Sequence, residues 1–118
     1  MKIVFRSKKV ERVCKNLKAA QRFFGDLGLA KSLLARVNAL ETAQVLKDII
    51  AMPSFRFHNL RGNLKGFFAI DVKTIREKWR IILQPLDDEQ EPFEPCNVDE
   101  VADICGAVMV REVSAHYE

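Results

Sequence analysis

The sequence contains few of the residues from which metal sites and disulfide frameworks are built, with two histidines and three cysteines in 118 residues. The cysteines, Cys14, Cys96 and Cys105, are odd in number and widely spaced, and none of them forms the close pairs that structural zinc sites use. We therefore expect free thiols in a reducing cytoplasm, with no disulfide, no metal ion and no other cofactor.

Long apolar runs and an N-terminal signal are also missing. The longest apolar runs, such as residues 66–70, are far shorter than the roughly 20 residues that cross a bilayer. The first nine residues lack the apolar stretch of a signal peptide, so we expect a cytoplasmic protein with no membrane partner. Hydrophobic residues at 48% and charged residues at 30% are typical of a globular protein, and we expect one domain, 1–118.

Basic residues are nearly absent from the last part of the chain. Residues 1–83 hold 18 of the 19 Lys and Arg but 6 of the 16 Asp and Glu, a net charge of +12. Residues 84–118 hold one base and ten acids, a net charge of −9. So basic a block indicates a polyanionic partner, nucleic acid first, and the alternative is scattered, solvated charge. The acidic segment 87–96 is expected to be a loop, and one hypothesis is that it folds over the basic surface.

Apolar residues three and four positions apart predict helices in the first half of the chain. Ser7 is expected to cap a helix over 8–24, and a second helix is expected over 28–40. Because the linker between them is short, these two helices should pack antiparallel as a hairpin. Thr42 is a candidate cap for a further short helix that ends at Met52.

Alternation of apolar and polar residues predicts strands in the rest of the chain. Together with a short strand at the start, the expected strands are 2–6, 55–58, 67–72, 79–83 and 108–115, with a short helix over 98–105. Short turns between consecutive strands indicate an antiparallel meander. The prediction is an α+β fold in which an N-terminal helical hairpin packs on a twisted antiparallel sheet.

Three segments and their order resemble a known family. The segment FRFHNLRGNLKGFFAIDV, residues 55–72, precedes WRIIL, residues 79–83, and the chain closes on EVSAHY, residues 112–117. This pattern is similar to the RelE/ParE toxin superfamily, and most of all to its HigB-like branch, the plasmid maintenance killer toxins. The resemblance spans residues 2–117 and implies a RelE-like fold.

The resemblance also implies a function, that of a toxin from a type II toxin–antitoxin module. HigB-like members are ribosome-dependent endoribonucleases that cleave mRNA without a metal ion and thereby inhibit translation. The implied partners are a cognate antitoxin of the helix-turn-helix type, the ribosome and mRNA, with operator DNA bound only through the antitoxin complex. ParE-like members share the scaffold but inhibit DNA gyrase, so that alternative stays open, as does a non-catalytic antitoxin or DNA-binding module.

Metal-independent RNA cleavage needs groups that move protons at the ribose 2′-hydroxyl and the leaving 5′-oxygen, and cations that stabilise the phosphate. Histidine suits the proton transfers because its unperturbed pKa is about 6.5, and the chain has only His58 and His116. Arg80 is expected to face the same side of the sheet as His58, and Tyr117 to stack on a base or donate a proton. The alternatives are that these strand residues have no role and that Tyr117 is frayed.

Further basic residues are candidates for binding RNA phosphates. Three surround the predicted turn after His58 and four lie on the predicted first helix: Arg56, Arg61, Lys65, Lys8, Lys9, Arg12 and Lys15. The planar guanidinium of arginine can bind a phosphate through two parallel hydrogen bonds, which lysine cannot do. The helix residues are expected to contact ribosomal RNA, and the alternative is an ordinary solvated helix face.

Overall fold

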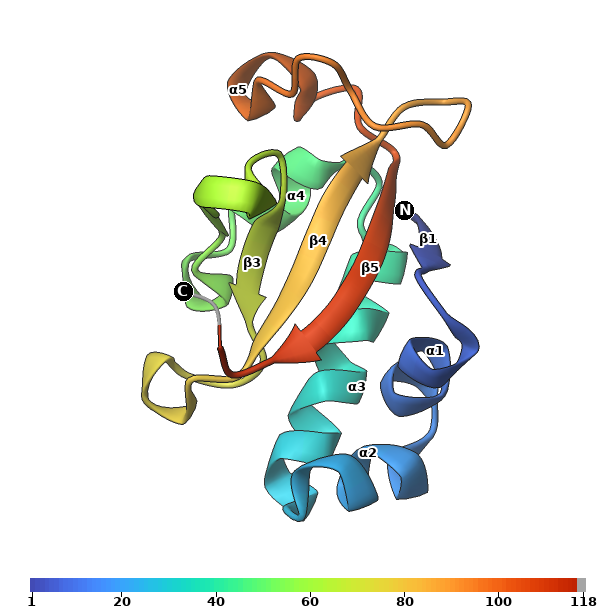
Figure 1. Ribbon diagram of the computed structural model, residues 1–118, viewed down its shortest axis with the longest axis vertical. Coiled ribbons are helices and arrows are strands. Elements are labelled where there is room, and N and C mark those ends of the chain that lie inside the picture. Colours follow the sequence, from blue (N-terminus) through green and yellow to red (C-terminus); the bar gives the residue numbers. More distant parts are fainter. Residues whose placement is uncertain (117–118) are drawn as a thin grey trace.

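The computed structural model describes residues 1–116, and the helices formed by residues 8–42 pack on one face of a five-stranded sheet (Figure 1). The strands are β1 (Lys2–Phe5), β2 (His58–Asn59), β3 (Phe68–Asp71), β4 (Arg80–Leu86) and β5 (Ala107–Ser114). The helices are α1 (Lys8–Lys15), α2 (Leu17–Phe24), α3 (Leu27–Thr42), α4 (Leu46–Ile50) and α5 (Val98–Val101). Three short 3₁₀ helices connect them: η1 (Pro53–Phe55), η2 (Gly62–Leu64) and η3 (Ile75–Glu77).

The sheet is mixed, with the strand order β1-β5-β4-β3-β2. Neighbouring strands from β5 through to β2 are antiparallel, whereas β1 runs parallel to β5. The predicted α+β class is confirmed, but the prediction of a wholly antiparallel sheet is wrong at β1. Almost the whole chain separates β1 from β5, so no tight turn constrains the direction in which β1 joins the sheet.

The predicted helix over 8–24 is two helices that meet at Asn16. The Asn16 backbone is extended, with φ −124° and ψ 119°, and its N–H closes α1 by donating to the Arg12 carbonyl oxygen at 3.0 Å. Its side-chain oxygen accepts the N–H of Ala19 at 2.9 Å and caps α2. Asparagine favours such caps over helix interiors, and here that local preference interrupts the apolar periodicity.

The predicted boundaries around α4 and α5 also need correction. Thr42 does not cap α4; it is the last residue of α3, and its hydroxyl donates to the Asn38 carbonyl oxygen at 2.8 Å. The start of α4 is held by Asp48, whose carboxylate accepts the N–H groups of Gln44 and Val45. The C-terminal helix ends at Val101, earlier than predicted.

The segment that was predicted as a strand over 55–58 pairs only from His58. Phe55 belongs to η1 and is buried, with the Arg36 guanidinium carbon 4.1 Å from its ring centroid. Arg56 then adopts a left-handed backbone, with φ 50° and ψ 51°, so extended pairing with β3 begins two residues later. The consequence is a very short edge strand preceded by a sharp bend.

The two faces of the sheet have different coverings. The main core lies between the sheet and the helices and holds Leu33 and Val37 of α3 against Ile70, Ile81 and others of the strands. Four buried residues form a smaller cluster next to η2, on the opposite face: Leu60, Leu64, Ala69 and Ile82. Because successive strand residues point to opposite faces, Arg80 shares its face with Ile82 rather than with Ile81. That face carries the site described below.

The acidic segment 87–96 contains no helix or strand and is joined to the end of β4 by a single bridge between Leu86 and Pro92. In Figure 1 it lies, with α5, beyond the end of the sheet at which β4 finishes. Among residues 1–116, no helix combines the length and apolar character that crossing a bilayer requires.

Candidate active site

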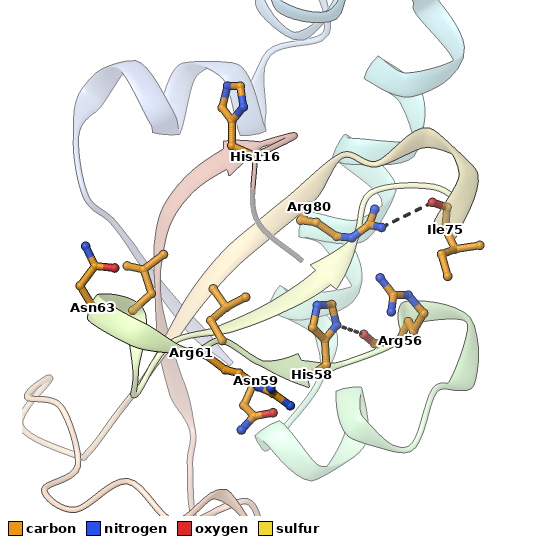
Figure 2. Close-up of a pocket in the computed structure, with 10 residues that line it drawn as sticks. Arg56, His58, Asn59, Arg61, Asn63, Ile75, Arg80 and His116 are labelled. Atoms are coloured by element: carbon orange, nitrogen blue, oxygen red, sulfur yellow. Dashed lines mark hydrogen bonds between the residues drawn. The ribbon is translucent and has the colours of Figure 1, made fainter.

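A cavity of about 700 Å³ opens beside β2 and gathers residues from distant parts of the chain (Figure 2). Five of the residues named from the sequence line it: Arg56, His58, Arg61, Arg80 and His116. They come from the turn before β2, from β2 and its following loop, from the first residue of β4, and from the segment after β5. Among residues 1–116, none that lines the cavity is acidic, so the described part of its surface carries positive charge.

His58 presents an unpaired nitrogen at this cavity. Its Nδ1 lies 2.7 Å from the carbonyl oxygen of Arg56, and its Nε2 is buried with no hydrogen-bond partner among the described residues. A carbonyl oxygen only accepts, so this contact places the proton of the neutral ring on Nδ1 and leaves a lone pair on Nε2. In Figure 2 the ring lies beside Arg56 and below Arg80. Nε2 therefore keeps a lone pair that no described residue uses, and its surface is covered in this structure.

Arg80 is buried rather than exposed on the strand, with 1% of its surface accessible. It stands opposite Asp71 in the β3–β4 register, and its Nε forms an ion pair with Asp71 Oδ1 at 3.1 Å. The angle at Nε does not allow a hydrogen bond between the two atoms. Its two terminal nitrogens donate to the carbonyl oxygens of Trp79, at 2.9 Å, and Ile75, at 3.4 Å. These contacts fix the guanidinium against the cavity wall. Arg80 and His58 line the same cavity, in agreement with the expected orientation.

Asp71 holds a second arginine of the cavity as well. The Nε of Arg56 lies 3.1 Å from Asp71 Oδ2 and 3.3 Å from Oδ1, and the carboxylate is buried, with 2% exposure. One buried anion thus orients two cations, which leaves a net positive charge facing the cavity. We did not expect this role for Asp71. The sequence did hold one indication of it, because Asp71 is the only acid in the otherwise apolar segment FFAID, residues 67–71. It lies two residues after Ala69, which pairs with His58.

Arg56 is held in an uncommon backbone conformation. A positive φ of 50° costs a residue with a Cβ atom about 1–2 kcal/mol. The ion pair with Asp71 and the contact of its carbonyl oxygen with His58 both depend on this bend. Strained backbone of this kind is frequent at functional sites, where the surrounding contacts hold it in place.

His116 lines the cavity from the far side. It is exposed, two residues beyond the end of β5, and its backbone N–H donates to Ser114 Oγ at 3.0 Å. Figure 2 shows it on the other side of the cavity from His58, with its ring pointing away from His58 and Arg80. Tyr117 lies outside the described residues, so its role stays a prediction.

Other residues predicted to bind RNA lie elsewhere. Lys65 lines a different hollow, beside Phe93 and Glu94. The four basic residues of α1 are outside the cavity, and α1 packs near β1 and β5, toward the sheet edge opposite β2: Lys8, Lys9, Arg12 and Lys15. No residue of 87–96 is among the described residues that line the cavity, so the acidic loop does not cover the cavity in this structure.

The three cysteines are free thiols, and two of them, Cys14 and Cys105, are buried. Burial raises the pKa of Cys14 to about 12 and also raises the pKa of Cys105, whose thiol lies 3.1 Å from the Ala107 carbonyl oxygen. Among the described residues, no group of three or more His, Cys, Asp or Glu side chains is arranged to hold a metal ion.

No protein-family model matches the chain, and no curated protein matches it either. The cavity and its contacts are therefore the basis for the function that follows.

Proposed function

We propose that the protein is a type II toxin with a RelE-like fold that cleaves mRNA on the ribosome without a metal ion. The observation that carries this proposal is the pairing, in one basic cavity, of an unpartnered His58 Nε2 with the guanidiniums of Arg80 and Arg56. Cations suit a phosphodiester, and an imidazole acceptor beside them suits removal of a proton from the adjacent ribose.

In the proposed reaction, His58 Nε2 accepts the proton of the 2′-hydroxyl as the 2′-oxygen forms a bond to phosphorus. The bond from phosphorus to the 5′-oxygen breaks, and His116 donates a proton to the leaving oxygen. The products are a 2′,3′-cyclic phosphate and a 5′-hydroxyl end. Arg80 and Arg56 stabilise the charge that develops on the phosphate oxygens, and their fixed orientation limits reorganisation during the step.

The ribosome enters the proposal as the partner that positions the substrate. The cavity holds few acid–base groups, so we expect slow cleavage of free RNA and faster cleavage where the message is held in place. The cytoplasm is then the expected location, and a helix-turn-helix antitoxin is the expected neutralising partner, through which operator DNA would be bound.

The test is to map RNA 5′-hydroxyl ends in bacteria after a brief pulse of expression without an antitoxin. We expect new ends within coding regions for the wild type and for Lys31→Ala, which removes an exposed cation outside the cavity. The double variant His58→Ala/His116→Ala should reduce these ends at least about 100-fold, as expected for the loss of general acid–base catalysis.

Circular dichroism of the purified double variant checks that it is folded. Growth arrest without new ends would contradict the nuclease proposal and indicate gyrase inhibition instead. Ends that persist in the folded double variant would remove both histidines from the mechanism.

A further inference from the structure

Two segments behind the candidate active site are joined by one arginine of α3. Arg36 is half-buried and donates from Nε to the Asp71 carbonyl oxygen at 2.9 Å. One of its terminal nitrogens donates to the carbonyl oxygens of Lys73, at 3.2 Å, and Ser54, at 3.3 Å. Its guanidinium carbon lies 4.1 Å from the ring centroid of Phe55. One side chain therefore joins the end of β3 to η1, the segment just before the bend that leads into β2.

The backbone of Asp71 faces the edge of the sheet on which β2 lies. The next residue, Val72, donates its N–H to the Trp79 carbonyl oxygen on the β4 side, at 3.1 Å. Backbone groups of successive residues in an antiparallel ladder point to opposite neighbours, so the N–H and carbonyl of Asp71 point away from β4. If β2 began two residues before His58 in the same register, Arg56 would stand opposite Asp71.

Arg36 takes the place of that longer strand. Arg56 has a left-handed backbone, so β2 pairs only from His58 onward. The Asp71 carbonyl oxygen then accepts a guanidinium N–H from Arg36 in place of a strand N–H. A buried carbonyl without a donor costs free energy, and Asp71 is 2% exposed. The arginine therefore stabilises the bent backbone relative to an extended one.

The bend gives the candidate site its geometry. It places the Arg56 carbonyl oxygen 2.7 Å from His58 Nδ1, and the Arg56 side chain on the Asp71 carboxylate. In an extended strand the carbonyl of residue 56 would point across the ladder to β3, whereas side chains stand out of the plane of the sheet. The contact with the His58 ring would then be lost.

Arginine suits this position better than lysine does. Its planar fork reaches carbonyl oxygens of two separate segments and lies flat on an aromatic ring, whereas lysine carries a compact charge. Burial lowers the pKa of the Arg36 guanidinium, and the nearby Asp71 carboxylate raises it. Arg36 does not line the cavity, so it can act on the site only through these contacts.

We propose that Arg36 is a positioning residue, which holds Arg56 in its bent conformation and thereby fixes the His58 ring in the cavity. The consequence for cleavage rests on the proposed function. The consequence for the His58 ring does not, so the two are measured separately.

The first experiment measures the tautomer of the His58 ring from its ¹⁵N chemical shifts, at pH values high enough that the shifts no longer change. The Arg56 carbonyl oxygen favours the proton on Nδ1 in the wild type. In Arg36→Met we expect the ratio of the Nδ1–H to the Nε2–H form to fall about tenfold, which is the effect of losing one hydrogen bond. Circular dichroism checks that the variant is folded.

Two further variants separate positioning from stability. Arg36→Lys keeps a cation but not the planar fork, so the ratio should fall in this milder variant as well. Val37→Ala is the control, because it removes core volume from the next residue of α3, which makes no side-chain hydrogen bond. It should keep the wild-type ratio. A ratio that is unchanged in both Arg36 variants, or that falls equally in Val37→Ala, would overturn the inference.

The second experiment compares mapped 5′-hydroxyl ends in cells. Arg36→Met should reduce them about 100-fold, as expected when a reacting group is displaced by about 1 Å, whereas Val37→Ala should retain them. Ends that persist unchanged in Arg36→Met would overturn the role of Arg36 in the site. If the wild type gives no ends but the tautomer ratio falls as expected, the nuclease proposal is contradicted and the positioning of His58 by Arg36 stands.

Discussion

At the scale of single residues, the buried carboxylate of Asp71 is the centre of the candidate site. It is 2% exposed and contacts Arg80, which is 1% exposed, and Arg56, which is half-buried. Taking charges out of water is costly, so each member of such a group depends on its partners. Removal of one partner leaves an uncompensated charge, whereas removal of a whole pair does not.

We predict that Asp71→Asn lowers the free energy of unfolding by about 3–5 kcal/mol, because Arg80 would be left buried without its anion. The double variant Asp71→Asn/Arg80→Met should be more stable than Asp71→Asn alone. Asp88→Asn, which removes an exposed acid, should change stability by less than about 0.5 kcal/mol. Urea denaturation measures all three. If Arg80→Met further destabilises Asp71→Asn, the two residues do not depend on each other in this way.

At the scale of elements, α1 presents exposed cations outside the cavity. Lys15 forms an ion pair with Glu41 at 2.7 Å, whereas Lys8, Lys9 and Arg12 have no ion-pair partner among the described residues. An exposed row of this kind suits contact with the phosphates of a large RNA. It lies toward the sheet edge opposite β2 and does not line the candidate active-site cavity.

We predict that the triple variant Lys8→Gln/Lys9→Gln/Arg12→Gln binds ribosomes more weakly than the wild type. The logarithm of its association constant should also fall less steeply with the logarithm of salt concentration, by about 2 in slope, because each lost phosphate contact removes about 0.7–0.9. A control with the same loss of charge replaces three lysines elsewhere with glutamine: Lys31, Lys47 and Lys73. Equal effects of the two triple variants, measured by sedimentation with ribosomes across salt concentrations, would mean that only net charge matters.

At the scale of the whole molecule, a thiol buried in the main core should lower the free energy of unfolding at alkaline pH. Cys14 is buried there, and burial raises the pKa of its thiol from 9.0 to about 12. Unfolding exposes the thiol and restores an ordinary pKa. Its contribution to stability is therefore fully present below pH 9 and is lost as pH rises from 9 toward 12.

We predict that the stability advantage of the wild type over Cys14→Ala falls by about 1.4 kcal/mol between pH 8 and pH 10. Urea denaturation of both proteins at the two pH values measures the difference, and groups that titrate in both proteins cancel. A constant difference across this range would show that the thiol ionises in the folded protein almost as readily as in the unfolded chain.

Some features could be predicted because they depend on neighbours in the sequence. Alternation located β3, β4 and β5 to within a few residues, since the period of a strand is a local property. The break at Asn16 was missed because the apolar periodicity continues across it. What ends one helix and starts the next there is a single side-chain hydrogen bond, from the Ala19 N–H to Asn16. The direction of β1 was missed because no local pattern encodes it.

The sequence by itself determined the α+β class, the positive charge of the first 83 residues and the scarcity of histidine that drew attention to His58 and His116. Only the tertiary structure decided that both histidines meet Arg56 and Arg80 in one cavity, that Asp71 holds these arginines, and that α1 and the acidic segment lie away from it. The physical reason is distance along the chain. Periodicity and capping act within a few residues, whereas a buried charge finds its partner across strands, and that pairing exists only once the sheet has formed.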